Sequence, residues 1–487
     1  MQKLALAGLL YLALITKVDA QNIGANWLLV YNKLMLTITP DSAIIDTLAD
    51  LANGFKAQSS IANSAGDLLF FSHGVDARNK NGAEMDNGCC LCESPEMPGT
   101  CIAGVSGSPH MQGSLIIPVP GADSLYYLFI KDKNLSPNGQ PARVQASLVD
   151  LRFNSGLGRV TSRSIPILLD TLSDSRMTAC KHANGRDWWL VNFEYKTNKI
   201  YTHLITPDSI YGPFEQSIGL FGNEPDAFGY SLFSQDGSIL ANVTLGMPGI
   251  TLLSFDRCAG NFSNYRTITY NANEAYATLA FSENNRFLYA GNGITVKQFD
   301  LWAPDITTSS ETLVVDTAAY PLLGEMVLMP DKKIYVAGQT TWGECLSVID
   351  SPDLKFPDCS FHLRSKCIPG SNLILTAPNF PNYSLSVLPN SGCDTLASIL
   401  DAQVRASEYF KIAPNPALEE IVISYKDLKL PCELVVLNLL GQMVHREVVN
   451  VNSGLSEVRI KTLPKGTYLV YVTEQTEAPQ TRRFVKL

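Results

Sequence analysis

Long apolar runs are almost absent from this sequence of 487 residues. The one such run covers residues 4–15, and it is shorter than the stretch of about 20 apolar residues that crosses a bilayer as a helix. Charged residues are also scarce, at 17%, and the formal net charge is −9. The chain therefore lacks the concentrated basic field that neutralises phosphate groups, which argues against nucleic acid and against an anionic membrane surface as partners.

The sequence also lacks the short motifs that mark common hydrolases. Residues 104–107 come nearest to a Gly-x-Ser-x-Gly elbow but have the wrong spacing, and the six histidines never form a His-Glu-x-x-His pair. Asp76, Glu84 and Asp86 could in principle form a glycosidase pair or hold calcium, but solvated turn carboxylates are the simpler interpretation. The sequence therefore predicts no catalytic residue, no metal-binding residue and no cofactor.

The N-terminus has the layout of a secretory signal peptide. Lys3 precedes the apolar run, and a small-residue site ending in Ala20 follows it. We expect residues 1–20 to be removed by cleavage between Ala20 and Gln21, which leaves no transmembrane segment in the mature chain. An uncleaved anchor or a buried first helix is the alternative.

Eleven cysteines in an exported chain favour disulfides, because an oxidising compartment lets them form and persist. The odd number leaves at least one thiol without an intramolecular partner. Two groups are candidates for pairing, with zinc binding by the first group as the alternative, although vicinal cysteines oppose shared chelation. The candidates are Cys89, Cys90, Cys92 and Cys101, and Cys345, Cys359 and Cys367. Within the second group we expect Cys345 to pair with Cys359.

Between residues 22 and 401, short β-branched and aromatic runs alternate with clusters of Gly, Asn, Asp, Ser and Pro, which predicts strands joined by tight turns. Six segments share one pattern, a polar turn followed by a strand of large apolar residues. They are residues 63–71, 122–129, 184–191, 235–240, 283–289 and 330–336. Their spacing of roughly 50 to 60 residues is typical of propeller blades, and Asp-Gly or Asn-Asn turns supply the positive φ angles of hairpins.

Further strands at residues 27–37 and 373–376 complete the prediction for this region. We expect an all-β fold in which residues 21–401 form a β-propeller of seven blades, with the first and last strands sharing one blade. Six or eight blades are alternatives. A pair of β-sandwiches or a β-helix is the alternative architecture.

The pattern changes after residue 401. Residues 402–408 read as a linker, and residues 409–487 contain short alternating strands at closer spacing, joined by turns at Gly441 and Gly466. About 80 residues of this pattern suit a small Ig-like β-sandwich.

Four short sequence motifs occur in this last segment, and their types and order resemble the type A sorting domain of type IX secretion substrates of Bacteroidetes. The matching positions are Pro414, Asn415, Pro416, Gly441, Gln442, Lys465, Gly466, Thr467, Tyr468 and Lys486. The resemblance implies export by the Sec route, recognition by the type IX secretion machinery at the outer membrane, and removal of the domain by a sortase-like cysteine peptidase. The protein would then be secreted or attached to the outer-membrane surface.

The larger region resembles uncharacterised propeller-bearing substrates of the same pathway. The resemblance covers most of residues 22–400 and rests on residues 66–74, 81–88, 115–121, 126–129 and 345–352 and on Cys359, but the sequence departs from it at residues 88–92 and in the insertion up to Cys101. It supplies no catalytic residue.

Two functions follow from the sequence. The first, which we favour, is an interaction protein whose propeller loops bind a protein, glycan or matrix ligand. The second is an extracellular hydrolase or lyase whose active site lies at the propeller channel. Carboxylates or histidines gathered at an open channel mouth would favour the second.

Overall fold

The structure is a computed structural model of the chain. It describes residues 22–29, 33–48, 57–92, 108, 110–132, 143–219, 229–244, 249–270, 276–316, 323–338, 344–369, 377–389, 391, 393, 410–413, 417–425, 430, 432–438, 443–474 and 480–486. Two compact units are present, Met1–Ser391 and Gly392–Leu487. No helix among the described residues is long and apolar enough to cross a membrane.

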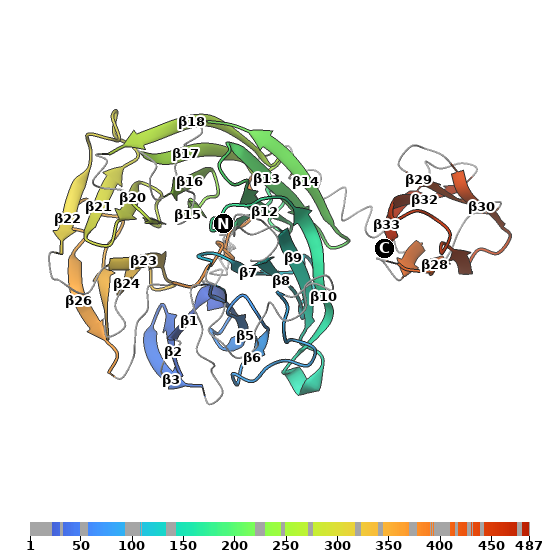
Figure 1. The fold of residues 1–487 in the computed structure, drawn as a ribbon, viewed down its shortest axis with the longest axis horizontal. Helices are drawn as coiled ribbons and strands as arrows, with labels where there is room; N and C mark the ends of the chain where they lie inside the picture. The colour runs from blue at the N-terminus through green and yellow to red at the C-terminus, as the bar shows by residue number, and fades with distance from the viewer. Residues whose placement is uncertain are drawn as a thin grey trace, which may run out of the picture. The chain divides into compact units, whose positions relative to one another are not determined.

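The larger unit is a ring of seven antiparallel sheets around a central axis (Figure 1). Blades 1 to 3 are formed by β1 (Asn26–Leu29), β2 (Leu34–Thr39) and β3 (Ser42–Thr47); by β4 (Ser59–Ala62), β5 (Leu68–Ser72) and β6 (Arg78–Asn79); and by β7 (Ser114–Pro118), β8 (Leu125–Asp132), β9 (Arg143–Asp150) and β10 (Arg159–Leu169). A 3-10 turn, η1 (Asn22–Gly24), precedes the first blade, and another, η3 (Asn154–Gly156), lies in blade 3.

Blades 4 to 7 have four strands each. They are formed by β11 (Thr178–Lys181), β12 (Trp188–Phe193), β13 (Lys199–Ile205) and β14 (Ile210–Ser217); by β15 (Gly229–Phe233), β16 (Ile239–Thr244), β17 (Gly249–Asp256) and β18 (Asn261–Thr269); by β19 (Thr278–Phe281), β20 (Phe287–Gly291), β21 (Thr295–Asp300) and β22 (Glu311–Val315); and by β23 (Leu323–Leu328), β24 (Ile334–Gly338), β25 (Cys345–Ile349) and β26 (Phe361–Cys367). The predicted all-β, seven-bladed propeller is confirmed.

The six repeated segments predicted from the sequence are the first hairpins of blades 2 to 7. In blade 5, Asp236 Oδ1 accepts the backbone N–H of Ser238 at 3.0 Å, and Asn184, Asn284 and Asp331 make the same contact two residues on in blades 4, 6 and 7. Each turn also contains a residue with positive φ, for example Gly237 at 74° and Asn285 at 61°. The polar turn residues therefore fix the hairpins, as such side chains do when they bond neighbouring backbone groups.

Apolar side chains fill the spaces between neighbouring blades. The innermost strands contact one another around the axis, as β15 does with β11 and β19. One cluster joins blades 4 and 5 through Trp189, Phe233 and Phe255, and another joins blades 5 and 6 through Leu252 and Phe281. The hydrophobic core is thus a series of interfaces between blades.

The smaller unit is a sandwich of two sheets. One sheet contains β27 (Phe410–Ala413), β28 (Glu420–Tyr425) and β31 (Gly454–Arg459), and the other contains β30 (Met443–Val449), β29 (Cys432–Asn438), β32 (Gly466–Glu474) and β33 (Gln480–Lys486). Alternate residues of β28 and β29 point into a common core with Tyr468 and Phe484. This arrangement agrees with the predicted Ig-like sandwich.

Several predictions about segment boundaries lie outside the described residues. They concern the signal peptide with its cleavage site at Ala20 and Gln21, the strand at 373–376 and the linker at 402–408.

Candidate functional site

The central channel of the propeller contains a segment of the chain itself, residues 377–389, which we name the strap. At one end, Asn379 bonds to backbone carbonyl groups beside the first residues of three innermost strands. Its Nδ2 donates to Ser114 at 3.1 Å and to Met177 at 2.9 Å, and its backbone N–H donates to Gln58 at 2.8 Å. The strap is thus anchored to blades 2, 3 and 4 where β4, β7 and β11 begin.

The other end of the strap lies beside the hairpin turns of blades 4 and 5. Asn382 Nδ2 donates to the carbonyl oxygen of Gln235 at 2.7 Å. The backbone N–H of Leu388 donates to the carbonyl oxygen of Ala183 at 2.8 Å. Gly185 has a φ of +70°, and a Cβ atom there would lie 2.5 Å from the backbone nitrogen of Val387. Since strand starts and hairpin turns lie at opposite ends of the innermost strands, the strap runs through the channel.

Arg257 fixes the far end of the strap. Its guanidinium donates to the carbonyl oxygens of Ser386 at 2.6 Å and of Lys181 at 2.9 Å, and it is 4% exposed. Burial lowers the pKa of Arg257, while Cys180 and Asp236 act in the opposite direction. An arginine can bond to several carbonyl oxygens at once, because its planar guanidinium group has five N–H donors.

The middle of the strap is aromatic. The ring of Tyr383 lies edge-on to Trp188, with 5.9 Å between centroids, and its hydroxyl donates to the carbonyl oxygen of Ile116 at 2.8 Å. Burial raises the pKa of Tyr383. Before it, the backbone N–H of Ala377 donates to the buried carboxylate of Glu325 in blade 7 at 2.7 Å. The strap therefore bonds to blades 2, 3, 4, 5 and 7.

Gln112 adds a contact between non-adjacent blades. Its side-chain amide donates to the carbonyl oxygen of Ser231 in blade 5 and accepts from the same residue's N–H, both at 2.9 Å, and it also donates to Asn379 Oδ1 at 3.3 Å. A fully satisfied buried network of this kind holds a single arrangement. The channel is consequently filled and hydrogen-bonded at this level.

A cavity of about 170 Å³ remains between the strap and blades 5, 6 and 7. Tyr230, Phe281, Met326, Lys332, Phe380 and Asn382 are among the residues that line it. Lys332 forms an ion pair with Glu283, which also lines the cavity. The lining offers one paired cation and one paired anion, and no arrangement of a nucleophile with a base.

Two histidines lie near the strand-start end of the channel. His110 Nδ1 bonds to a carboxylate oxygen of Asp174, while its Nε2 is buried without a partner among the described residues. His73 is also buried, and its Nε2 has no hydrogen-bond partner among the described residues. Burial, together with the positive charge of the nearby Arg78, lowers the pKa of His73 to about 3. A His–Asp pair can position a general base, but His110 is 2% exposed, so a substrate would have to displace packed protein to reach it.

The acidic residues considered in the sequence have arginine or backbone partners. Asp76 is buried and pairs with Arg78 at 2.8 Å, and burial raises its pKa. Asp86 pairs with Arg159 at 3.1 Å. Within the described ranges, no group of three or more His, Cys, Asp or Glu side chains could hold a metal ion.

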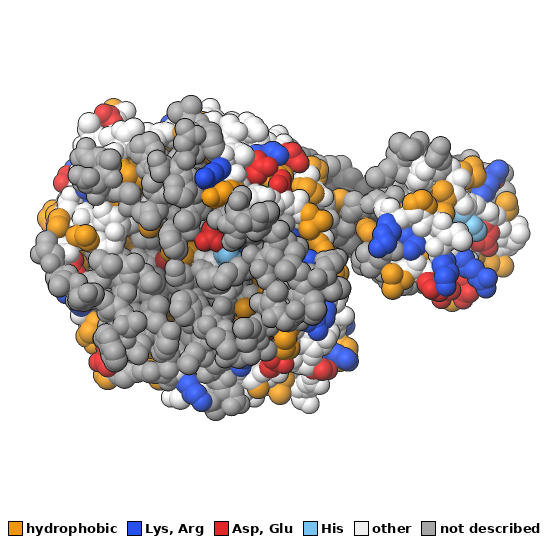
Figure 2. Space-filling view, in the orientation of Figure 1, with side chains coloured by type: hydrophobic (Ala, Val, Ile, Leu, Met, Phe, Trp, Pro, Cys, Tyr) orange, Lys and Arg blue, Asp and Glu red, His pale blue; other side chains and the backbone are white. Residues whose placement is uncertain are grey.

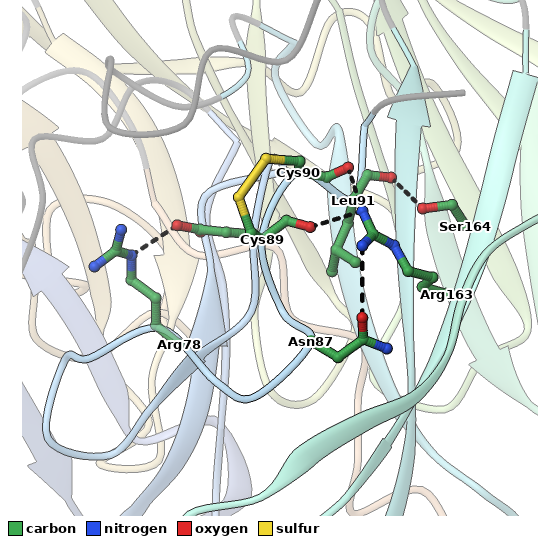
Figure 3. The surroundings of a disulfide bond; sticks show 8 residues. Arg78, Asn87, Cys89, Cys90, Leu91, Arg163 and Ser164 are labelled. Atoms are coloured by element: carbon green, nitrogen blue, oxygen red, sulfur yellow. Dashed lines mark hydrogen bonds and ion pairs between the residues drawn. A yellow bond between two sulfur atoms is a disulfide. The ribbon is translucent and has the colours of Figure 1, made fainter. Parts of the chain in front are cut away.

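The cysteine-rich loop lies against the outer strand of blade 3 (Figure 3). Cys89 and Cys90 form a disulfide, and Arg163 donates from Nη2 to the carbonyl oxygens of both, at 3.0 and 3.2 Å. Ser164 Oγ donates to the carbonyl oxygen of Leu91 at 2.8 Å. Cys92 is disulfide-bonded as well, and Cys101 lies outside the described residues.

The expected pairing of Cys345 with Cys359 is wrong. Cys345 pairs with Cys367, because these residues lie directly opposite each other in the antiparallel register of β25 and β26. Cys359 lies in the connection between those strands and is a buried free thiol that packs in the core between blades 6 and 7. Burial raises the pKa of Cys359.

Of the sorting-motif positions, the second half lies in described residues. Tyr468 is buried and stacks on Phe484, with 5.4 Å between ring centroids, and its hydroxyl donates to the carbonyl oxygen of Pro464 at 2.8 Å. Lys465, Gly466 and Thr467 lead into β32, and Lys486 ends β33. The remaining motif positions, Pro414, Asn415, Pro416, Gly441 and Gln442, lie outside the described residues.

Charged side chains of both signs lie beside hydrophobic and uncharged ones on the face of the C-terminal unit that Figure 2 shows. Arg446 pairs with Glu433 at 2.5 Å and Lys461 pairs with Glu419 at 2.8 Å. Exposed pairs of this kind contribute little to stability.

Sequence analysis missed the strap. Its signal is Pro378 and Pro381, each followed by asparagine. Proline cannot donate to a sheet ladder, and asparagine side chains bond to backbone groups, so this pattern indicates an extended segment held by its side chains.

Comparisons with known proteins agree with the C-terminal assignment. Residues 411–486 match the family model described as "Secretion system C-terminal sorting domain". No curated protein matches the chain.

Several solved structures resemble the chain at low similarity. PorZ, a surface component of the type IX secretion system of Porphyromonas gingivalis, has 13% identity and a TM-score of 0.31, with 94% of this chain and 68% of that chain covered. The periplasmic gluconolactonase PpgL of Pseudomonas aeruginosa has 14% identity and a TM-score of 0.36, with 80% and 94% covered. At these scores the likenesses carry no argument about function.

The fold and the sorting domain together define the class of protein. The chain is an all-β protein in which a seven-bladed propeller is followed by a C-terminal secretion sorting domain. It is a substrate of the type IX route and is therefore a secreted or outer-membrane surface-attached protein.

Proposed function

We propose that the exported propeller is a binding protein, which recognises an extracellular protein, glycan or matrix ligand with its outer surfaces. The observation that carries this proposal is the strap. Residues 377–389 occupy the channel, where propeller enzymes assemble their active sites. The side chain of Asn379 bonds this segment to the backbone of blades 3 and 4, and Arg257 bonds to the backbone of the segment at Ser386. A channel-mouth hydrolase or lyase would need an open channel, so we do not favour that alternative.

We also propose the processing of the chain. Cleavage between Ala20 and Gln21 removes the signal peptide. The type IX machinery then recognises the sorting domain, and a sortase-like peptidase removes it. We expect Pro414, Asn415, Pro416 and the turn from Lys465 to Tyr468 to carry this recognition.

The binding proposal is tested with the mature protein purified from culture medium. Labelled protein is added to envelopes of the native host and to extracellular matrix, with unlabelled protein as competitor. We expect saturable binding that the competitor abolishes. Turnover of polysaccharide, lactone or peptide substrates, without saturable binding, would show that the enzyme alternative is right.

A further inference from the structure

Trp302 is exposed, unlike the other tryptophans in the part of the chain that the structure describes. Its side chain is 67% exposed, whereas the other described tryptophans, Trp27, Trp188 and Trp189, are 2%, 2% and 4% exposed. Transfer of a large aromatic side chain from water into the core is favourable by about 2 to 3 kcal/mol. This ring therefore forgoes a stabilisation that the other three obtain.

Trp302 also has defined partners for its ring and its backbone, which separates it from an ordinary surface residue. The guanidinium of Arg286 lies over its ring, 5.4 Å from the centroid. Asp300 fixes both partners, because its carboxylate accepts from Arg286 Nη2 at 2.8 Å and from the backbone N–H of Trp302 at 3.1 Å. Hydrogen bonds from Arg286 are the largest influence on Asp300 and lower its pKa, so the pair stays ionised at neutral pH.

The turn that carries Trp302 also exposes polar groups. Asp305 and Thr308 are both exposed, and Asp305 Oδ1 accepts the backbone N–H groups of Thr307 at 3.0 Å and Thr308 at 3.4 Å, which fixes the loop. The surface thus combines one immobilised aromatic ring with carboxylate and hydroxyl groups on the same short turn between β21 and β22.

We propose that Trp302 is the platform of a carbohydrate-binding site, on which the C–H face of a pyranose ring stacks while Asp305 and Thr308 bond to its hydroxyl groups. The inference rests on the proposed binding function and names its ligand class. A pyranose has an apolar face and a polar rim, which suits an exposed aromatic ring on a turn that also exposes a carboxylate and a hydroxyl group. Because the ring is already ordered by Arg286 and Asp300, little conformational entropy is lost on binding.

The small area of the platform favours a sugar over a protein. A tryptophan buries about 150 to 250 Å², whereas a stable protein interface buries about 800 Å² on each partner. One ring and a few hydrogen bonds suit millimolar binding of a single sugar, on the order of 4 kcal/mol. Binding to a polymer with many sugar units would be correspondingly easier to detect.

The test is affinity electrophoresis of the full chain in gels that contain a soluble β-glucan or α-mannan. We expect at least one polymer to retard the wild type, Trp302→Ala to weaken this binding at least tenfold, and Trp302→Phe to weaken it less. The matched control is Phe153→Ala, because Phe153 is 41% exposed and lies under Arg159 at 5.6 Å. This control should migrate like the wild type.

The outcomes separate this inference from the proposed function. Equal retardation of wild type and Trp302→Ala would place sugar binding elsewhere and overturn the Trp302 site alone. No retardation of the wild type, together with saturable binding to a protein ligand, would overturn the carbohydrate inference and leave the binding function standing. Absence of both kinds of binding would overturn both proposals.

Discussion

Asn379 donates a hydrogen bond of 3.1 Å to the carbonyl oxygen of Ser114, a residue 265 positions earlier in the chain. The same amide reaches Met177 and accepts from Gln112. One side chain near the end of the propeller thus satisfies backbone groups of two blades at the channel, and most of the propeller's sequence lies between the partners.

The substitution Asn379→Ala should destabilise the propeller by about 3 kcal/mol, because it removes the side-chain donor to the carbonyl groups of Ser114 and Met177 and one of the hydrogen bonds of Gln112. Thermal unfolding followed by near-UV circular dichroism measures the loss. The control is Asn81→Ala, since Asn81 is exposed and bonds to Asn79 through its backbone N–H and not through its side chain. Equal melting temperatures for Asn379→Ala and Asn81→Ala would contradict the role of the strap.

Truncation separates the strap from the sorting domain. A chain that ends after residue 409 keeps the strap and should retain a cooperative unfolding transition. A chain that ends after residue 376 lacks it and should lose cooperativity or become sensitive to limited proteolysis. If both chains melt at the same temperature, the strap does not close the ring.

The disulfide between Cys345 and Cys367 should stabilise blade 7 by about 3 kcal/mol, a typical value for a closed loop of this size. The double substitution Cys345→Ala/Cys367→Ala measures it in denaturant unfolding. Peptide mapping without reduction should recover Cys345 joined to Cys367, and Cys359 should react with iodoacetamide only after denaturation. A peptide joining Cys345 to Cys359 would show that this pairing is wrong.

Stability should fall in mild acid because of His73. The pKa of this buried histidine is lowered from 6.5 to about 3, so between these values the unfolded chain binds a proton that the folded chain does not. Its stabilisation is complete above about pH 6.5 and is lost as the pH falls; from pH 6.5 to 5 the loss is about 2 kcal/mol. His73→Phe should flatten this dependence in urea unfolding, and His362→Gln, at a more exposed histidine, should not.

The sorting domain depends on Tyr468. Replacement by alanine removes its stacking on Phe484 and leaves a cavity, which should cost about 3 to 5 kcal/mol and reduce export. Replacement by phenylalanine removes only the hydrogen bond to Pro464, at a cost of about 1 kcal/mol. Immunoblots of medium and cells of the native host would measure export. Normal export of Tyr468→Ala would show that a folded sorting domain is not needed.

The propeller could be predicted because its signals are local. Asp236 and Asn284 bond to backbone groups two residues away, so the hairpin is encoded within a few letters and repeats from blade to blade. The sorting domain was recognisable for a similar reason, because each of its motifs consists of residues that are adjacent in the sequence.

The channel and the disulfide could not be predicted because their partners are remote. Gln112 and Ser231 are 119 positions apart, and no periodicity links them. Cys367 faces Cys345 only once the register of β25 and β26 is set, including the shift between Leu346 and Val348, which spacing does not show. Trp302 reads as one more aromatic residue until its exposure is known.

The location of the strap has a consequence for synthesis. The chain is synthesised from its amino end, and Asn379 follows the last blade. The carbonyl groups of Gln58, Ser114 and Met177 therefore lack this hydrogen-bond donor until all blades have been made. A premature stop codon in any blade would release an open ring with its axis exposed to proteases. Such a copy also lacks the sorting domain at residues 411–486, so we expect it neither to close its ring nor to reach the ligand outside the cell.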